Sequence, residues 1–490
     1  MVAPERPRVE TRAVTVRTDT KTAVALALGT FALLWVGAAS GSHFDSDDAL
    51  YAQMAREMAR SGDWFDNRWS GVVLFEKPPL VLWALALCGT LGDWTPLALR
   101  LPGLLAAAAG VAGLFLLART AGAERRRALL AALLFGTSGL AMLFSRRLMM
   151  DLPLVVLLIF AAREALSRRA WTFGLCAGLC VLTKGPAAAP PLVAIALTAG
   201  LGLRSLTISI AVGLAVAAPW HLLETARHGV AFWQGYLGHH VAERLTSSVV
   251  PGLSRVELLG TLFDLERALV PLALIGLVVG YRLRTVGERV LVAWLAIVLA
   301  TLLLSTTRLP QYLMLLLPPL AWLGSGAVPA GWLAHRWAPA GLTAMALVAF
   351  LANPAKLTYW LDPDFGPDSA RLGHLIRTQA GPDDLVATLD TTTSALTFAA
   401  DRRIVILARD PRFLEVQNAV HMVRRAEVLR PFTPEALAPP SLAARRFVVC
   451  RATDAEWVSE RLHAAAPDRT VARVTAGRLV LLHDGTLGAE

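Results

Sequence analysis

The chain has 490 residues, of which 55% are hydrophobic and only 17% are charged. Together with a mean hydropathy of +0.53, this composition excludes an ordinary soluble protein of this size and indicates a membrane protein. The net charge of +10 comes mostly from arginines beside apolar runs, without a lysine-rich tract, which argues against a nucleic-acid partner.

The first apolar run follows a basic N-terminus. Arg6, Arg8, Arg12, Arg17 and Lys21 precede it without a convincing cleavage site, which predicts an uncleaved anchor. A helix needs roughly 20 apolar residues to cross the hydrocarbon core, and by that rule the chain offers about eleven candidate spans. They fall near residues 22–40, 98–118, 128–144, 152–166, 170–183, 187–203, 205–221, 267–282, 288–305, 310–325 and 337–353.

Basic clusters at the span ends predict the sidedness, because Lys and Arg beside spans stay in the cytoplasm. If the N-terminus is cytoplasmic, the span order places every such cluster on that side. The clusters are Arg125 to Arg127, Arg168-Arg169, Arg204, Arg282 with Arg284, and His335-Arg336. We therefore predict a multi-pass protein of the cytoplasmic (inner) membrane, with loops 41–97, 145–151 and 222–266 and all residues after about 354 outside.

The stretch from Pro78 to Trp94 is apolar enough to be a further span. A full crossing there would move the Arg125 cluster outside. We therefore expect a helix that lies in the interface or re-enters it, with Trp83 and Trp94 as interfacial aromatics. An ordinary span remains the alternative.

The last part of the chain changes character. Charged residues become frequent, and β-branched runs at 384–389, 403–407, 447–450 and 479–482 alternate with helix-like stretches. We predict two domains on this basis. Residues 1–355 form an all-α transmembrane domain with interfacial helices in the outer loop 41–97, and residues 356–490 form a small soluble α/β domain in the extracytoplasmic space.

Ionisable residues gather in the predicted outer loops. A charge at the bilayer centre costs about 2.5 to 3.5 kcal/mol, so clusters beside spans indicate a polar cavity. The first loop carries Asp45, Asp47 and Asp48, then an amphipathic segment at 51–64. The later motifs are Phe75-Glu76-Lys77-Pro78-Pro79, Ala98-Leu99-Arg100-Leu101-Pro102, Met150-Asp151-Leu152-Pro153, Thr183-Lys184-Gly185-Pro186, Pro219-Trp220, His240 with Arg244, and Arg308-Leu309-Pro310 followed by Tyr312.

This series of motifs covers about residues 20–325 and resembles that of the GT-C glycosyltransferases related to lipid A aminoarabinose transferase and protein O-mannosyltransferases. The resemblance implies a GT-C fold with about 11 to 13 transmembrane helices. It also implies transfer of a sugar, with inversion, from a polyprenyl-phosphate carrier to a lipid, glycan or protein acceptor. Relatives that modify lipid A tend to have Arg before the tyrosine of the first motif, where this chain has Leu50, so their sugar and acceptor are not carried over.

The resemblance also implies roles for single residues. Asp47 and Asp151 correspond to paired acidic residues near the reacting centre, and Asp48 is a further candidate beside them. The positions that contact the carrier phosphate are Lys77, Arg244 and Tyr312. Glu76 and His240 match residues that line the same cavity and can bind a divalent metal ion.

The residue types suit this chemistry by themselves. A polyprenyl-phosphate is already a good leaving group, so the enzyme needs cations and not the proton-donating acid of a glycosidase. Besides Lys77 and Arg244, Lys184 and Arg308 can hold the phosphodiester. A hydroxyl acceptor needs a carboxylate to take its proton, for which Asp47 is the first choice, whereas a phosphate acceptor needs no base.

Structural roles are the alternatives for these residues. The three aspartates could cap helices, the lysines could snorkel to the interface, and His240 could be an interfacial polar residue. For the whole protein, the alternatives are a non-catalytic binder of polyprenyl-phosphate lipids and a flippase-like transporter. A transporter would show pseudo-repeated halves, which the sequence does not.

The predicted topology can be tested by cysteine labelling in a background without the four native cysteines. Arg126→Cys should react with a membrane-impermeant maleimide only after permeabilisation, whereas Asp63→Cys should react in intact cells, because the basic cluster stays inside. Labelling of both positions from the same side would contradict the span order.

Overall fold

The structure, a computed structural model, describes residues 8–39, 47–75, 77–243, 253–279, 285–351, 367–391, 394–409, 429–437, 441 and 444–484. The chain divides into two compact units. Unit 1 comprises Met1–Ala39, Arg100–His221 and Leu245–Leu361. Unit 2 comprises Ser40–Leu99, Leu222–Arg244 and Asp362–Glu490.

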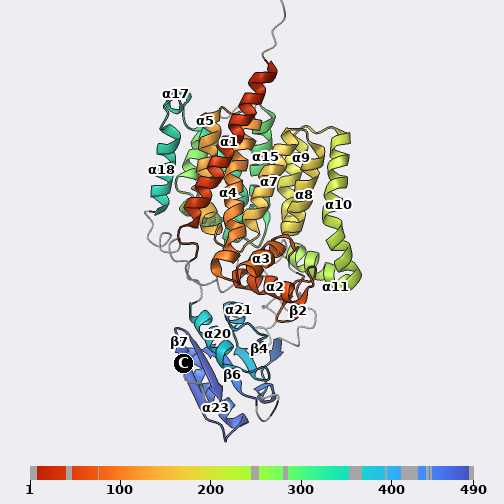
Figure 1. Cartoon of the computed structure of the whole chain (residues 1–490), viewed down its shortest axis with the longest axis vertical. Coiled ribbons are helices and arrows are strands. Elements are labelled where there is room, and N and C mark those ends of the chain that lie inside the picture. Colours follow the sequence, from red (N-terminus) through yellow and green to blue (C-terminus); the bar gives the residue numbers. More distant parts are fainter. Residues whose placement is uncertain are drawn as a thin grey trace, which may run out of the picture. The chain divides into compact units, whose positions relative to one another are not determined.

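Unit 1 is a bundle of apolar helices (Figure 1). Its elements are α1 (Arg8–Trp35), α4 (Pro96–Thr120), α5 (Arg125–Gly136), α6 (Gly139–Phe144), α7 (Asp151–Leu166), α8 (Ala170–Lys184), η1 (Gly185–Ala188), α9 (Ala189–Thr198), α10 (Leu203–His228), α13 (Arg255–Leu265), α14 (Leu269–Val279), α15 (Val286–Leu304), η3 (Pro310–Leu316), α16 (Leu317–Gly326), α17 (Ala330–Leu333) and α18 (Ala338–Leu351). The start of α4 and the end of α10 belong to unit 2.

Each predicted span overlaps a helix of this bundle. By length and composition, four described stretches could cross a membrane: Pro96–Thr120, Ala170–Thr198, Leu203–His228 and Val286–Leu304. The prediction of one continuous span near 128–144 was wrong, because the helix breaks after Gly136. A new helix, α6, begins there, and the Ser138 side chain caps it by accepting a hydrogen bond from the Ala141 N–H.

The stretch Ala170–Thr198 does not run straight. The chain reverses at Gly185, whose φ of +57° favours glycine. Arg168, just before α8, donates a hydrogen bond to the carbonyl oxygen of Gly200, just after α9, over 2.7 Å. The two ends of the stretch therefore lie together, and α8 and α9 run antiparallel on either side of Gly185.

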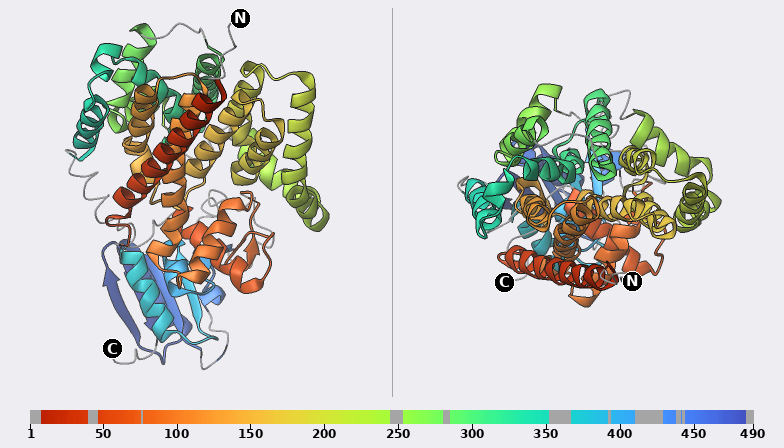
Figure 2. Two further views of the ribbon diagram at one scale, coloured as in Figure 1. Left: turned by 45° about the horizontal axis from the view of Figure 1, so that its top comes forward. Right: turned by 90° about the horizontal axis from the view of Figure 1, so that it is seen from above.

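Glycines bring α8 against α10. A Cβ on Gly174 would lie 2.4 Å from the Ser209 carbonyl oxygen, and one on Gly178 would lie 2.7 Å from that of Gly213. Such small residues four apart let two helix backbones approach closely, which is how helices commonly associate in membranes. Figure 2 (right) shows the helices of the bundle side by side and nearly end-on.

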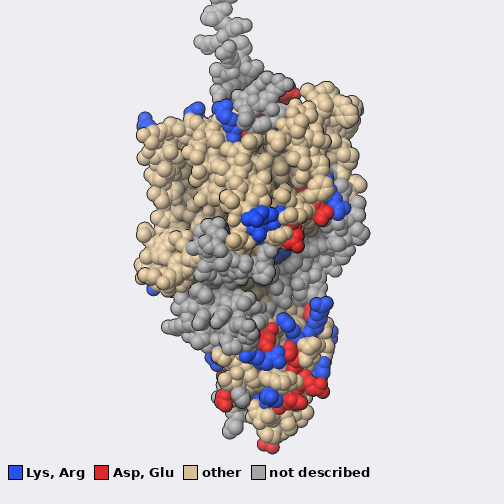
Figure 3. Space-filling model, turned by 180° about the vertical axis from the view of Figure 1, so that it is seen from behind, with Lys and Arg blue, Asp and Glu red and all other residues tan. Residues whose placement is uncertain are grey.

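Several basic residues meet at one end of the bundle. Arg119 pairs with Asp19 over 2.8 Å, and Arg125 donates to the hydroxyl of Thr22 over 2.6 Å. Arg126 donates to the carbonyl oxygen of Leu333 over 2.8 Å. In Figure 3 much of the bundle surface is uncharged, with blue side chains at one end and a mixed blue and red patch toward the other. This arrangement brings the middle of α1 and the basic cluster of α5 together.

Unit 2 contains a six-stranded sheet with the strand order β5-β4-β3-β6-β8-β7. The strands are β3 (Leu385–Leu389), β4 (Val405–Ala408), β5 (Leu429–Pro431), β6 (Arg446–Arg451), β7 (Val471–Ala476) and β8 (Leu479–Asp484). β3 pairs in parallel with β4 and β6, β5 pairs in parallel with β4, and β8 pairs antiparallel with β6 and β7. The predicted strands and the α/β class of this part are confirmed, whereas β5 and β7 were missed.

Helices cover both faces of this sheet. Phe447 and Val449 of β6 pack in one core with α20 (Pro367–Gln379) and α21 (Ser394–Ala400). Val448 and Cys450 pack in a second core with α23 (Ala455–Ala465). Successive residues of a strand face opposite sides of the sheet. A strand covered on both faces, such as β6, therefore needs a continuous apolar run. Figure 2 (left) shows α20 lying across the sheet.

The described part of the first predicted outer loop also belongs to unit 2. It forms α2 (Asp47–Ser61), a small hairpin of β1 (Arg68–Trp69) and β2 (Val72–Val73), and α3 (Leu80–Leu91). α3 has 12 residues, so it is about 18 Å long and short of a bilayer crossing. Its Trp83 indole N–H donates to the carbonyl oxygen of Trp64 over 2.6 Å.

α2 packs against α21 through a buried arginine. Arg56 is 3% exposed, and its guanidinium lies 4.1 Å from the ring centroid of Phe398 and 3.2 Å from Asp401. Arg60 donates two hydrogen bonds to Asp401, over 2.5 and 2.7 Å. A segment assigned by sequence to the transmembrane domain thus packs on the C-terminal sheet domain. The predicted boundary at 355/356 lies outside the described residues and stays a prediction.

Asp401→Asn should destabilise unit 2 by about 3 kcal/mol, because it leaves the buried charge of Arg56 without its counter-ion. Burial would raise the pKa of Asp401, but the hydrogen bond from Arg60 and the charge of Arg56 outweigh it and lower the pKa. The contribution is therefore present at neutral pH and lost as the pH falls below about 4, near the ordinary pKa of Asp.

Thermal unfolding and limited proteolysis of the purified variant would measure this effect. Glu460→Ala is the control, since its pair with Arg461 is exposed and worth little. Equal stability of the two variants would show that the contact between α2 and α21 contributes nothing.

Candidate functional site

An ion pair is buried at one end of the bundle in unit 1. The ammonium of Lys184 binds the carboxylate of Asp151, and the side chains are 13% and 2% exposed. The same ammonium lies 4.9 Å from the ring centroid of Tyr312. Three residues from separate predicted motifs are therefore brought together, and the ring face adds a cation–π contact to the pair.

Helix lengths explain why these residues meet. α7 has 16 residues and α8 has 15, so the two helices are about 24 and 22 Å long. Only Ser167, Arg168 and Arg169 join them, and the two helices pack against each other. Asp151 at the start of α7 and Lys184 at the end of α8 consequently lie at the same level of the hairpin.

The structural alternatives for this pair fit less well. The cap residue of α7 is Met150, and Asp151 is the first residue inside the helix. Lys184 does not extend along the surface, because its side chain is mostly buried against Asp151 and Tyr312. A lysine ammonium has three N–H donors, so Lys184 can bind Asp151 and an oxygen of an anionic ligand together.

Arg308, also predicted to bind the carrier phosphate, is tied to the backbone. Its Nε donates to the carbonyl oxygen of Leu253 over 2.6 Å, and another N–H donates to that of Ser305. The Leu253 N–H in turn donates to the Arg308 carbonyl oxygen over 2.9 Å. In the described structure Arg308 thus anchors the segment that leads into Tyr312.

Two buried arginines were not among the predicted site residues. Arg100 and Arg146 are each 1% exposed. Arg100 donates to the carbonyl oxygen of Ala38 over 2.8 Å, and Arg146 donates to those of Leu34 and Val36. Cations suit the unsatisfied carbonyls at a helix C-terminus. Both arginines thus hold the end of α1, and the sequence signal was an arginine within or beside a predicted span.

The remaining described site residues lie in unit 2. Asp47 and Asp48 open α2, and Asp48 is 2% exposed. Lys77 follows the hairpin and is half-buried, and its carbonyl oxygen accepts a hydrogen bond from Asn67 over 2.5 Å. Glu57 of α2 accepts hydrogen bonds from the N–H groups at the hairpin turn, 2.7 Å from Ser70 and 2.9 Å from Gly71, so α2 positions the hairpin.

The predicted metal pair falls largely outside the described part of the chain. Glu76 and Arg244 are outside it, and His240 lies in η2 (Gln234–Glu243) with its side chain not described. Within the described residues, the side chains grouped closely enough to hold a metal ion are Asp66, Glu224 and His228 of unit 2. Sequence reasoning missed this group because residues 66 and 224–228 share no local pattern.

Comparison with known proteins identifies relatives. Residues 76–222 match the family described as dolichyl-phosphate-mannose-protein mannosyltransferase. An undecaprenyl phosphate-alpha-4-amino-4-deoxy-L-arabinose arabinosyl transferase from Pseudomonas aeruginosa (strain LESB58) is 31% identical over 301 residues, 56% of this chain and 54% of the relative. One from Pectobacterium carotovorum subsp. carotovorum (strain PC1) is 31% identical over 218 residues, 40% and 39% of the two chains. The chain spans about half the length of the Pseudomonas relatives it matches.

Solved structures share the fold. ArnT from Cupriavidus metallidurans bound to undecaprenyl phosphate aligns with a TM-score of 0.78 and 16% identity over 94% of this chain and 97% of that one. Arabinofuranosyltransferase AftD from Mycobacteria aligns with a TM-score of 0.57 and 14% identity over 96% of this chain and 40% of that one. The chain is thus a multi-pass membrane protein with the GT-C fold, related in sequence to the undecaprenyl-phosphate aminoarabinose transferases.

Proposed function

We propose that the protein is a membrane glycosyltransferase that moves a sugar, with inversion, from a polyprenyl-phosphate carrier to a lipid acceptor. The observation that carries the proposal is the buried Asp151–Lys184 pair beside Tyr312, a charged group maintained at one end of an apolar bundle. The names of the curated relatives and the undecaprenyl phosphate bound to ArnT support the choice of carrier. Glycan and protein acceptors are the second choice.

The reaction is assigned to the outer face of the cytoplasmic membrane. The N-terminus and the Arg125 to Arg127 cluster would then be cytoplasmic, as the positive-inside rule requires. Contacts of Arg119, Arg125 and Arg126 at a single end of the bundle support this assignment. The sheet domain would be extracytoplasmic.

The departing phosphate needs positive charge more than a proton. When the bond from the anomeric carbon to the phosphate oxygen breaks, the electron pair stays on that oxygen and the negative charge there increases. Cations fixed in place before the reaction stabilise this charge without reorganisation. We assign this role to Lys184, held in place by Asp151, and to Lys77, with Tyr312 positioning the Lys184 ammonium.

The acceptor must attack from the opposite face of the sugar. A hydroxyl oxygen of the acceptor forms the new bond to the anomeric carbon, and its proton passes to a carboxylate, for which Asp47 is the assigned base. An acceptor phosphate would need no such step.

Asp47→Asn and Lys77→Ala should lower sugar transfer by about 100-fold or more, since each removes a charge used in the transition state. Asp47→Asn should leave the affinity for undecaprenyl phosphate unchanged, because the carboxylate is assigned to the acceptor. Transfer is measured by mass spectrometry of lipids from cells with and without each variant, which also identifies the sugar and the acceptor. Asp93→Asn, at an exposed left-handed residue that Asn also tolerates, is the control.

Normal transfer by the purified Asp47→Asn variant would show that Asp47 is not the base. Unchanged lipids in cells that lack the protein, with undecaprenyl phosphate still bound by the purified chain, would favour a non-catalytic binder.

Lys184→Met should weaken binding of undecaprenyl phosphate and lower transfer by about 100-fold, because the variant keeps the apolar stem and loses the ammonium. Asp151→Asn should affect transfer similarly, and the double variant should be no worse than either single one, since the two residues act as a unit. Native mass spectrometry of the purified variants with undecaprenyl phosphate measures the binding. Lys21→Met, at an exposed lysine of α1, is the control. Full activity of Lys184→Met would refute the assigned phosphate site.

A further inference from the structure

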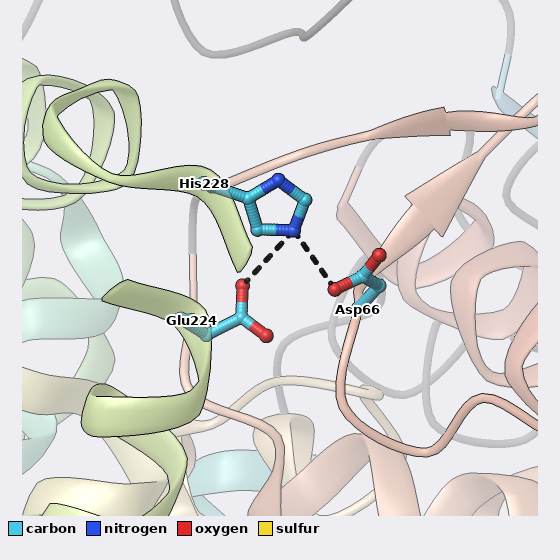
Figure 4. Close-up of side chains that lie close together, drawn as sticks. All are labelled: Asp66, Glu224 and His228. Carbon is cyan, nitrogen blue, oxygen red and sulfur yellow. Dashed lines mark hydrogen bonds and ion pairs between the residues drawn. The ribbon is translucent and has the colours of Figure 1, made fainter. Parts of the chain in front are cut away.

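Three metal-ligating side chains meet in unit 2. Asp66 lies in the segment between α2 and β1, and Glu224 and His228 lie one turn apart at the end of α10. Figure 4 shows their side chains pointing toward one another. One ligand atom from each residue lies within 4.8 Å of the other two.

The spacing suits a small cation. His228 Nε2 lies 3.0 Å from Asp66 Oδ1 and 3.9 Å from Glu224 Oε2. Ligands of a tetrahedral zinc ion at about 2.0 to 2.1 Å from the metal are about 3.3 Å apart, so the observed distances bracket the required one.

Burial makes this arrangement costly without a ligand. Asp66 is 4% exposed and Glu224 is 1% exposed. The Oε1 atom of Glu224 is buried, and it accepts a hydrogen bond from none of the residues that the structure describes. A buried carboxylate oxygen without a partner loses its hydration and gains nothing in return. This oxygen therefore has capacity for a ligand that the described side chains do not supply.

The surrounding charges leave one carboxylate unmatched. Arg227 binds Asp63 and Asp66, each over 3.0 Å. Arg68 binds the same two aspartates, over 3.2 and 2.8 Å. Two guanidinium groups thus face three carboxylates, because the buried Glu224 lies beside Asp66 and 3.9 Å from His228. A bound proton or a bound metal cation would supply the missing positive charge.

We propose that Asp66, Glu224 and His228 bind a divalent transition-metal ion, with Zn²⁺ as the best match. One imidazole and two carboxylates are ligands that zinc accepts, and three protein ligands leave a fourth position for water or a ligand oxygen. The ring of Phe75 packs on His228 with centroids 5.0 Å apart, which restrains the imidazole. The ion would tie the segment before β1 to the end of α10.

This site differs from the predicted pair of Glu76 and His240, and its existence does not depend on the sugar-transfer chemistry. The test uses full-length protein purified with a tag that binds no metal, treated with a chelator and then dialysed against Zn²⁺. Bound zinc is measured by inductively coupled plasma mass spectrometry, affinity by competition with a chromogenic chelator, and stability by thermal unfolding.

Wild-type protein should retain about one zinc ion per chain at these ligands. Asp66→Asn, Glu224→Gln and His228→Ala should each weaken zinc binding at least about tenfold, since loss of a ligand costs no less than loss of a residue that only orients one. Chelation should lower the unfolding temperature of the wild type, and zinc should restore it. Glu224→Gln keeps the side-chain shape, so it reports on binding even if a larger change disturbs folding.

His374→Ala, at an exposed histidine of α20, is the matched control and should bind zinc as the wild type does. His240→Ala distinguishes the two candidate sites. Zinc lost only in His240→Ala would assign the ion to that residue and overturn the proposal. The proposal is also overturned if the wild type binds no zinc and chelation does not change its unfolding temperature. A shared proton would then supply the missing positive charge.

Discussion

An ionised carboxylate inside an apolar bundle needs a cation beside it, and this requirement organises the charged end of unit 1. Separating Asp151 from Lys184 would leave both charges poorly solvated, which is far more costly than the loss of an exposed pair. The pair therefore stabilises the alignment of α7 and α8 that their similar lengths and short connection produce. Tyr312, brought in by η3 from a distant part of the chain, covers the same ammonium. One contact is therefore part of both the helix alignment and the site geometry.

Unit 2 illustrates a different solution, in which polar contacts join segments that are far apart in the chain. Glu57 of α2 holds the hairpin turn, Arg56 of the same helix reaches Asp401, and Arg227 at the end of α10 binds Asp63. Each of these contacts pairs groups that would be costly to bury alone. The first outer loop thereby becomes part of a compact body with the sheet domain, although its sequence shows only a short amphipathic segment and a hydrophobic helix.

Local patterns were enough to predict the apolar spans of the bundle and the inner strands of the sheet, but not α13 or the break between α5 and α6. Continuous apolar runs such as Phe447 to Cys450 signal a strand covered on both faces, and the structure shows it. β7 was missed because it lies at the sheet edge and only its last residue is buried, and β5 because it has only three residues. The Asp151–Lys184 pair joins two motifs seen in sequence. By contrast, the contacts of Arg56 with Asp401 and of Asp66 with His228 depend on tertiary packing, for which one sequence holds no periodic signal.

The packing of α2 on α21 bears on how the sheet domain could be exchanged between related proteins. Asp401 and the ring of Phe398 belong to the sheet domain, whereas Arg56 and Arg60 belong to the helix that opens with Asp47. A chimaera joined only near residue 356 would place the sheet domain of another protein against α2. The buried guanidinium of Arg56 would then face a surface that lacks its carboxylate partner. Grafts should therefore carry α2 along with the sheet domain, or restore a carboxylate at the position of Asp401. Asp47 and Asp48, at the start of α2, would then belong to a helix that still packs on α21.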